Sequence, residues 1–159
     1  MKKIFFILLN ILWMGPIWGQ QYSENDSLYL IAFEKYTLQI DSFYSKYSDN
    51  KNQYSTIYVE ETDLLKPIPN RINKRKVVVL NYENIKKVYK QNNWKLIQLK
   101  ISPMEIENGQ MEITFTPYHC EMEKNGNLKL ALSDWTKVYF EFSCKNRKWI
   151  YNRTENSGI

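Results

Sequence analysis

The stretch MEITFTPYHCEM, residues 111–122, decides the fold because its first half alternates between apolar and polar residues. Met111, Ile113 and Phe115 fall on one face of an extended chain, and the polar residues between them fall on the other. This alternation is typical of a strand that packs one face on a core and leaves the other face open. The stretch is therefore predicted to be a strand of an antiparallel sheet.

The segments on both sides of this strand predict further strands. Val138, Phe140 and Phe142 repeat the alternation downstream. The other candidate strands are Trp94–Ile101, Leu128–Leu132, Lys137–Cys144 and Lys148–Tyr151, with turns at Asn108-Gly109 and Asn125-Gly126. Strands in this order, joined by short turns, predict an antiparallel meander.

The N-terminal half predicts helices and two shorter strands. Ser23 to Asp49 has apolar residues at three-and-four spacing and reads as one long helix, which Ser23 or Asp26 can cap. Strands are predicted at Thr56–Glu60 and Val77–Leu80, an exposed basic loop at Pro67–Lys76, and a short amphipathic helix at Tyr82–Gln91. Together these elements predict an α+β fold in which the long N-terminal helix packs on a curved antiparallel β-sheet.

The first residues read as an export signal. Lys2 and Lys3 precede an apolar run from Ile4 to Met14, and Gly15-Pro16 and Gly19 follow it. The run is shorter than the about 20 apolar residues of a membrane-spanning helix, so no stable membrane anchor is expected after cleavage. Residues 1–19 are predicted to be a signal peptide and residues 20–159 a single domain that is periplasmic or secreted.

Charge is distributed unevenly along the mature chain. Without Lys2 and Lys3, 20 of the 22 basic residues remain against 17 acidic ones, a net charge of +3. Ten of these basic residues, but only one acidic residue, lie between Lys66 and Lys100. The candidates for contact with an anionic or protein partner are Lys66, Arg71, Lys74, Arg75 and Lys76. A solvated loop explains the same charges. Because the protein is predicted to be exported, no nucleic-acid partner is expected.

Two cysteines, Cys120 and Cys144, are expected to form a disulfide in an oxidising compartment, with two reduced cysteines as the alternative. The strand pattern places them on opposite faces, so the bridge requires one inserted residue near Pro117. Two cysteines and one histidine do not make up a zinc site.

His119 is the only histidine and therefore the only candidate for proton transfer near neutral pH. With Trp135 it is a candidate for a pocket or for acid–base chemistry, although a structural or surface role explains both residues. Phosphate-binding glycine loops, a GxSxG elbow and an HExxH helix are missing from the sequence. The sequence therefore predicts no catalytic residue, metal or cofactor.

In the order of its predicted elements, a long helix followed by a curled antiparallel sheet, the chain resembles the cystatin-like and NTF2-like cone folds. The resemblance implies a concave sheet face, and such folds carry both enzymes and binding modules. We interpret the sequence as that of an exported, non-enzymatic module that binds a small ligand or a protein partner. A small hydrolase that uses the concave face, or an inhibitor or immunity-type protein, is the alternative.

Overall fold

Strand β6 (Gln110–Met122) is the strand around which the sheet of this protein is built. The computed structural model describes residues 22–47, 55–123, 125–132 and 134–158; the predicted signal peptide lies outside them. The second half of β6 pairs with β4 (Lys95–Ile101), and its first half pairs with β8 (Asp134–Ser143) on the opposite edge. The two ends of β6 also pair with β5 (Glu105–Glu107) and β7 (Leu128–Leu132).

The C-terminal strands are antiparallel and end in β9 (Lys148–Gly158) beside β8. They form the predicted meander only in part, because β7 and β8 both pair with β6 and not with each other. The N-terminal strands are β1 (Thr56–Glu60), β2 (Arg71–Ile72) and β3 (Arg75–Leu80). The strand order is β2-β3-β1-β4-β6-β8-β9, and β1 is parallel to both β3 and β4. The sheet is therefore mixed, and the prediction of a purely antiparallel sheet is wrong. The chain crosses over between β3 and β4 through helix α3 (Ile85–Gln91), which a parallel arrangement requires.

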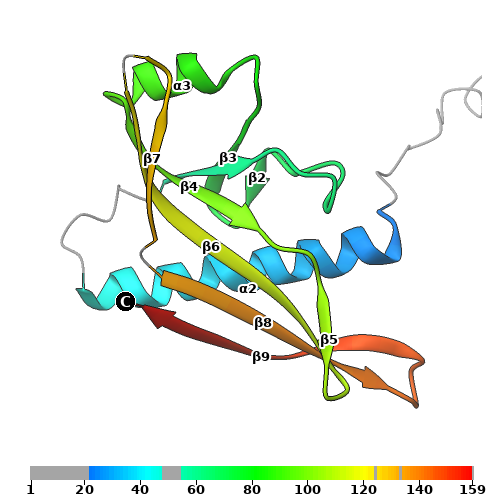
Figure 1. The fold of residues 1–159 in the computed structure, drawn as a ribbon. Helices are drawn as coiled ribbons and strands as arrows, with labels where there is room; N and C mark the ends of the chain where they lie inside the picture. Colours follow the sequence, from blue (N-terminus) through cyan, green and yellow to red (C-terminus); the bar gives the residue numbers. More distant parts are fainter. Residues whose placement is uncertain (1–21, 48–54, 124, 133, 159) are drawn as a thin grey trace, which may run out of the picture.

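Helix α2 (Glu24–Tyr47) occupies the region of the predicted N-terminal helix. Ser23 caps it, because its Oγ accepts the Asp26 N–H at 3.1 Å and the Asp26 carboxylate accepts the Ser23 N–H at 3.3 Å. One face of α2 packs on the sheet, where the Phe115 ring lies 5.8 Å from that of Phe33 and 4.9 Å from that of Tyr36. We call the apolar core formed here the α2-side core. Figure 1 shows the helix running across β6 and β8.

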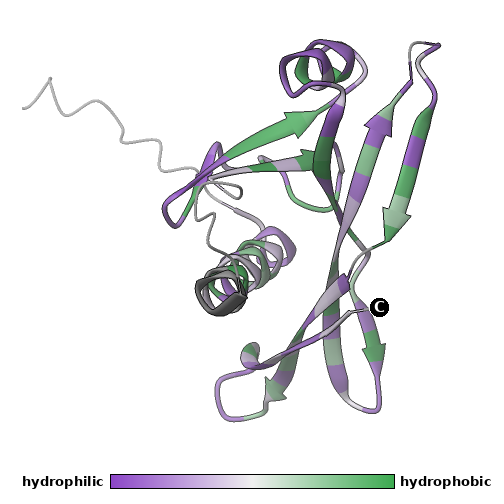
Figure 2. Ribbon diagram, turned by 90° about the vertical axis from the view of Figure 1, so that its left-hand side faces the viewer, coloured by the Kyte–Doolittle hydropathy of each residue, from purple (hydrophilic) through white to green (hydrophobic). Residues whose placement is uncertain are grey.

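A second, smaller core lies on the opposite side of the sheet, beneath α3. Its buried members, the α3-side core, are Leu80, Tyr89, Cys120 and Met122. Figure 2 shows the two helices separated by the N-terminal strands. The first half of β6 buries its side chains toward α2 and the second half buries them toward α3. This strand therefore contributes to both cores.

The change of buried face along β6 needs no inserted residue. The β4–β6 pairs run without interruption from Leu96–Cys120 to Ile101–Phe115. Pro117 therefore keeps the same register as its neighbours, and the inserted residue that the disulfide required is not present. Cys120 is buried because α3 covers the second face of the sheet, which the alternation of β6 alone does not reveal.

The predicted Cys120–Cys144 disulfide is wrong for this fold, because both thiols are free. Cys144 is exposed in the turn after β8, beyond Glu141, which pairs with Gln110 at the start of β6. Cys120 lies about ten residues further along β6, which corresponds to roughly 30 Å at the rise of a strand. A disulfide needs Cα atoms within about 7 Å of each other.

Candidate functional site

A pocket of about 690 Å³ lies between the C-terminal half of α2 and the sheet. Its volume falls in the usual range for small-molecule sites, roughly 300–1,000 Å³. The apolar lining comes from two layers: Tyr36 and Ile40 belong to α2, and Ile57, Leu99 and Pro117 belong to strands β1, β4 and β6. The same alternation that builds the α2-side core thus extends into this lining.

The pocket forms where two neighbouring strands stop pairing. Strands β1 and β4 are paired only at Tyr58–Gln98 and Val59–Leu99. The residues just before these pairs, Thr56 and Ile57 on β1 and Leu96 and Ile97 on β4, all line the pocket. The sheet therefore leaves room beside α2 at this point, instead of continuing as a close-packed ladder.

Polar and charged side chains line the pocket where β6, β7, β8 and β9 meet. Those from the sheet include His119, Glu121, Lys129, Asp134 and Asn156. The Lys95 Nζ lies 3.5 Å from a carboxylate oxygen of Glu121, and the Lys129 Nζ lies 2.6 Å from one of Glu123. The hydrogen bond from Lys129 lowers the pKa of Glu123, and the same bond raises the pKa of Lys129. Both cations are thus matched by a carboxylate, from Glu121 of β6 and from Glu123 just after it.

His119 lies in this pocket, opposite Ile97 of β4 and Ala131 of β7 in the sheet register. It shares a sheet face with Glu121, two residues further along β6. In the described part of the chain no hydrogen bond or ion pair holds the imidazole, while Glu121 is engaged by Lys95. The structure therefore brings the histidine and an acid to one pocket without joining them.

Trp135 lies outside this pocket, although the sequence made it a candidate beside His119. It stands on the opposite face of β8, where the Lys137 Nζ lies 5.7 Å from the centre of its ring. The Lys137 Nζ is also 2.7 Å from a carboxylate oxygen of Glu112, and this hydrogen bond raises the pKa of Lys137. The structure therefore separates the two candidate pocket residues.

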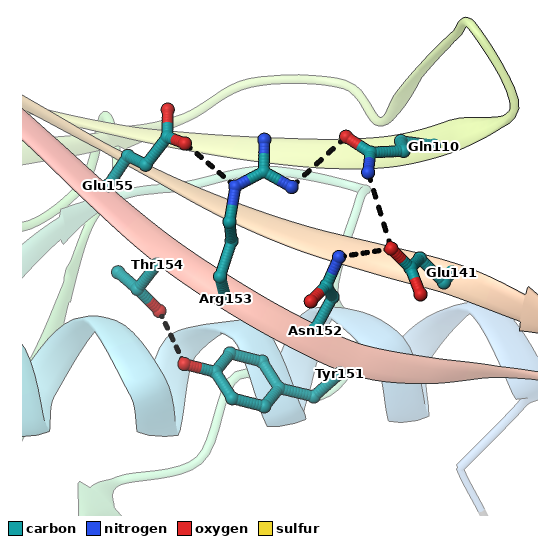
Figure 3. A network of polar contacts seen from close by, with 7 residues as sticks. All are labelled: Gln110, Glu141, Tyr151, Asn152, Arg153, Thr154 and Glu155. Atoms are coloured by element: carbon teal, nitrogen blue, oxygen red, sulfur yellow. Dashed lines mark hydrogen bonds and ion pairs between the residues drawn. The ribbon is translucent and has the colours of Figure 1, made fainter.

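The same open face carries a network of polar side chains, drawn in Figure 3. The Arg153 guanidinium donates to Glu155 at 2.7 Å and to Gln110 at 3.1 Å, and it covers the Tyr139 ring at 3.9 Å. Gln110 donates in turn to Glu141 at 3.3 Å, which also accepts from Asn152. Asn152 is the extra residue where the β8–β9 register shifts. These groups satisfy one another, so the network is a surface of the sheet with its hydrogen bonds made.

The basic segment forms neither wall nor rim of the pocket. Lys66, Arg71, Lys74 and Lys76 are exposed, and Lys66 pairs with Asp63. The prediction that Arg75 is an exposed contact residue is wrong. Arg75 is only 8% exposed, because it points from β3 to the same side as the core residue Val77. Part of the predicted loop is also the β2–β3 hairpin, with Arg71 paired to Lys76. Arg75 therefore cannot serve as a surface contact for a partner.

Beneath α3, buried polar groups surround Cys120. The Tyr89 hydroxyl donates to the Gln98 side-chain oxygen at 3.1 Å, and the Gln98 amide donates to Glu60 at 3.4 Å. Burial raises the pKa of the Tyr89 hydroxyl and that of the Cys120 thiol. Because a raised pKa keeps the thiol protonated, Cys120 packs as an apolar side chain and is a poor nucleophile.

The described residues contain no group of three or more His, Cys, Asp or Glu side chains placed to hold a metal ion. None of the helices in these residues is long and apolar enough to cross a membrane. Comparison of the sequence with protein-family models and with curated proteins gives no match.

Sequence reasoning found His119 but missed most of the pocket. The alternation of β6 already places Pro117, His119 and Glu121 on one face. Gln39 of α2 and Asn156 of β9 line the same pocket although they are 117 positions apart. Nothing in the sequence predicts this proximity, because it depends on the order of the strands in the sheet.

Proposed function

We propose that this protein is an exported, non-enzymatic module that binds a small ligand in the pocket between α2 and the sheet. The observation that carries the proposal is the pocket itself, with an apolar lining from two layers and polar groups where four strands meet. This combination is characteristic of sites that bury the body of a ligand and fix its orientation with a few hydrogen bonds.

The lining specifies the chemistry of the ligand. Ile40, Ile57 and Leu99 favour an apolar body, which gains about 25 cal/mol for each Å² of apolar surface removed from water. His119 and Asn156 offer hydrogen bonds at the polar side. The ligand class is therefore a compact, largely apolar molecule with one polar end.

Export supports this function without defining it. The charged start, apolar run and Gly19 of the sequence support cleavage before Gln20. Intact-mass measurement of the exported protein tests this point, and retention of Met1 would contradict it. We also propose that the sheet curves around α2 as in the cystatin-like and NTF2-like cone folds, since a concave face accounts for a pocket beside the helix.

A titration with the fluorescent probe 8-anilinonaphthalene-1-sulfonate, which has an apolar body and one anionic group, tests the pocket. Gln39→Trp projects an indole ring into the pocket from α2 and occupies part of it, whereas Leu38→Trp places the same ring on the neighbouring, exposed residue outside the lining. We expect saturable binding that Gln39→Trp weakens at least about tenfold, or roughly 1.4 kcal/mol, and that Leu38→Trp leaves unchanged. Equal binding by all three proteins would contradict the proposal.

A small hydrolase is the second candidate, favoured by one observation: His119, Glu121 and Asp134 line the same pocket. Acid–base catalysis needs a histidine or carboxylate within hydrogen-bond reach of the reacting group. The test is turnover of p-nitrophenyl esters, phosphates and glycosides by the parent protein and by His119→Ala. Turnover that His119→Ala abolishes would replace the binding function with catalysis, and we expect none.

A further inference from the structure

Strand β7 (Leu128–Leu132) lies at an edge of the sheet and exposes large apolar side chains. Leu130 is 58% exposed and Leu132 is 43% exposed. Among the described residues β7 pairs with β6 alone, and β9 ends at Gly158, opposite Asp134 and just short of β7. Figure 2 shows β7 at the right-hand margin, with green hydrophobic segments and no element beyond it. Proteins ordinarily protect such an edge because it can pair with another strand.

The backbone N–H and C=O groups of the three leucines of β7, Leu128, Leu130 and Leu132, point toward this free edge. The Glu123 N–H donates to the Asn127 carbonyl at 2.9 Å, so these residues form a hydrogen-bonded pair of the β6–β7 ladder. Hydrogen-bonded and non-hydrogen-bonded pairs alternate in an antiparallel ladder. Pairs 121–129 and 119–131 are then hydrogen-bonded, and the N–H and C=O groups of Leu128, Leu130 and Leu132 point away from β6.

The side chains of these leucines lie on the side of the sheet that α3 covers. Leu130 is opposite Cys120, a member of the α3-side core, and Leu128 packs against that core. Lys129 and Ala131 alternate with them and point to the other side of the sheet, and the lining of the pocket takes in Leu130 as well as these two residues. A strand added at this edge would therefore extend the α3-side core with its own apolar side chains.

We propose that β7 pairs with β7 of a second copy of this chain, antiparallel and centred on Leu130. The sequence LKLAL is complementary to itself in this register. Leu130 faces the copy's Leu130, Leu128 faces Leu132, and Lys129 faces Ala131, so that no cation faces a cation. In each of the three leucine pairs both residues have outward N–H and C=O groups, and each pair exchanges two hydrogen bonds.

In other registers fewer backbone N–H and C=O groups of β7 form hydrogen bonds with the second copy. A shift of one residue in the pairing places an outward-facing backbone group opposite an inward-facing one, which leaves both without the inter-strand bond. A centre on Leu128 or Leu132 keeps the bonding pattern but overlaps fewer residues of the strand. The centre on Leu130 alone pairs all five residues of β7 and joins the two sheets into one, an isologous arrangement with twofold symmetry.

Because residue 130 meets its own copy, opposite charges at this position test the contact directly. We expect the purified exported protein at tens of micromolar concentration to sediment with twice the monomer mass. Leu130→Asp and Leu130→Lys each place like charges face to face and should each weaken the dimer at least about tenfold. An equimolar mixture of the two variants should recover a dimer that contains one copy of each.

The matched controls are Ile106→Asp and Ile106→Lys on β5, which change an exposed apolar residue, 65% exposed, of another edge strand. They should leave the dimer intact. Far-ultraviolet circular dichroism checks that each Leu130 variant is folded, and recovery of the mixed dimer provides a second check. A monomeric parent protein, a dimer that survives Leu130→Asp, or folded variants that do not associate on mixing would each overturn the proposal. A parent protein that is a monomer by itself but pairs with a strand of another protein would also overturn the proposal.

Discussion

The two faces of the sheet are covered very differently. On the α2 side one continuous core runs from the helix across β1, β4, β6 and β8, and the pocket opens within that layer. On the other side a small core beneath α3 covers only the upper part of the sheet, and the rest is the polar surface of Figure 3. The difference shows that the α2 side supplies most of the buried apolar surface as well as the candidate binding site.

The two faces should also contribute differently to the free energy of unfolding. Apolar burial contributes about 25 cal/mol per Å², so the larger core contributes more to the free energy of unfolding. The ion pairs of the open face are partly solvated, and such pairs contribute only about 0–1 kcal/mol each. Substitutions on the two faces should therefore differ in cost, and the following variants test that difference.

The largest effect is expected for Phe115→Ala. Phe115 is fully buried in the α2-side core and packs against both Phe33 and Tyr36. Its loss should lower the free energy of unfolding by about 3–5 kcal/mol, measured by urea denaturation. As a matched comparison of the two faces, Met111→Ala should cost more than Met122→Ala, since the first residue belongs to the larger core. A greater cost for Met122→Ala would reverse the ranking of the two cores.

The next effect contrasts two neighbouring cations of the basic segment. Arg75 is buried and Lys74 is exposed, so Arg75→Ala removes packing and buried polar contacts that Lys74→Ala does not touch. Arg75→Ala should lower the free energy of unfolding by about 2 kcal/mol, and Lys74→Ala by less than about 0.5 kcal/mol. Equal denaturation midpoints for the two variants would show that Arg75 is not held in the core.

A smaller effect should appear at alkaline pH on the α3 side. Burial raises the pKa of Tyr89 above its unfolded value of about 10, so the hydroxyl stays neutral in the folded protein while the unfolded chain ionises. Stability is therefore retained below pH 10 and lost above it, by at most about 1.4 kcal/mol from this group at pH 11. Tyr89→Phe should reduce the loss between pH 9 and pH 11, measured by denaturation at each pH. A loss of unchanged size would assign it to other groups, such as Tyr29, whose pKa burial also raises.

The smallest effect is expected on the open face. Arg153 joins Glu155 and Gln110 in an exposed network, so Arg153→Ala should lower the free energy of unfolding less than any of the substitutions of buried residues above. The remaining effect should shrink further in 1 M salt, because salt screens exposed ion pairs. A cost similar to that of Phe115→Ala would mean that this surface is part of the structural core.

Local patterns in the sequence predicted most of the individual elements. The alternation at Met111, Ile113 and Phe115 identified β6 and the buried face of its first half, and the spacing of apolar residues identified α2 and α3. The strand pairing was harder to predict, because periodicity within a strand carries no information on its neighbours. The parallel arrangement of β1 with β3 and β4 was missed for this reason.

The errors at Cys120 and Arg75 share one physical cause. Both side chains are buried in the folded protein: Cys120 belongs to the core beneath α3, and Arg75 points from β3 to the same side as the core residue Val77. The sequence around each residue indicates its strand but not what packs on that strand. His119 could be named as a candidate from composition alone, because it is the only histidine, whereas the pocket around it depends on the complete sheet.

The central claim is that the α2-side pocket holds a small ligand, and native mass spectrometry of the protein purified from the cells that make it tests this claim most directly. The parent protein and the Leu38→Trp variant should carry a non-covalent small-molecule adduct that is released on denaturation. The Gln39→Trp variant, whose indole ring occupies part of the pocket, should carry much less of it. A parent protein without an adduct, or an adduct that Gln39→Trp retains in full, would contradict the claim.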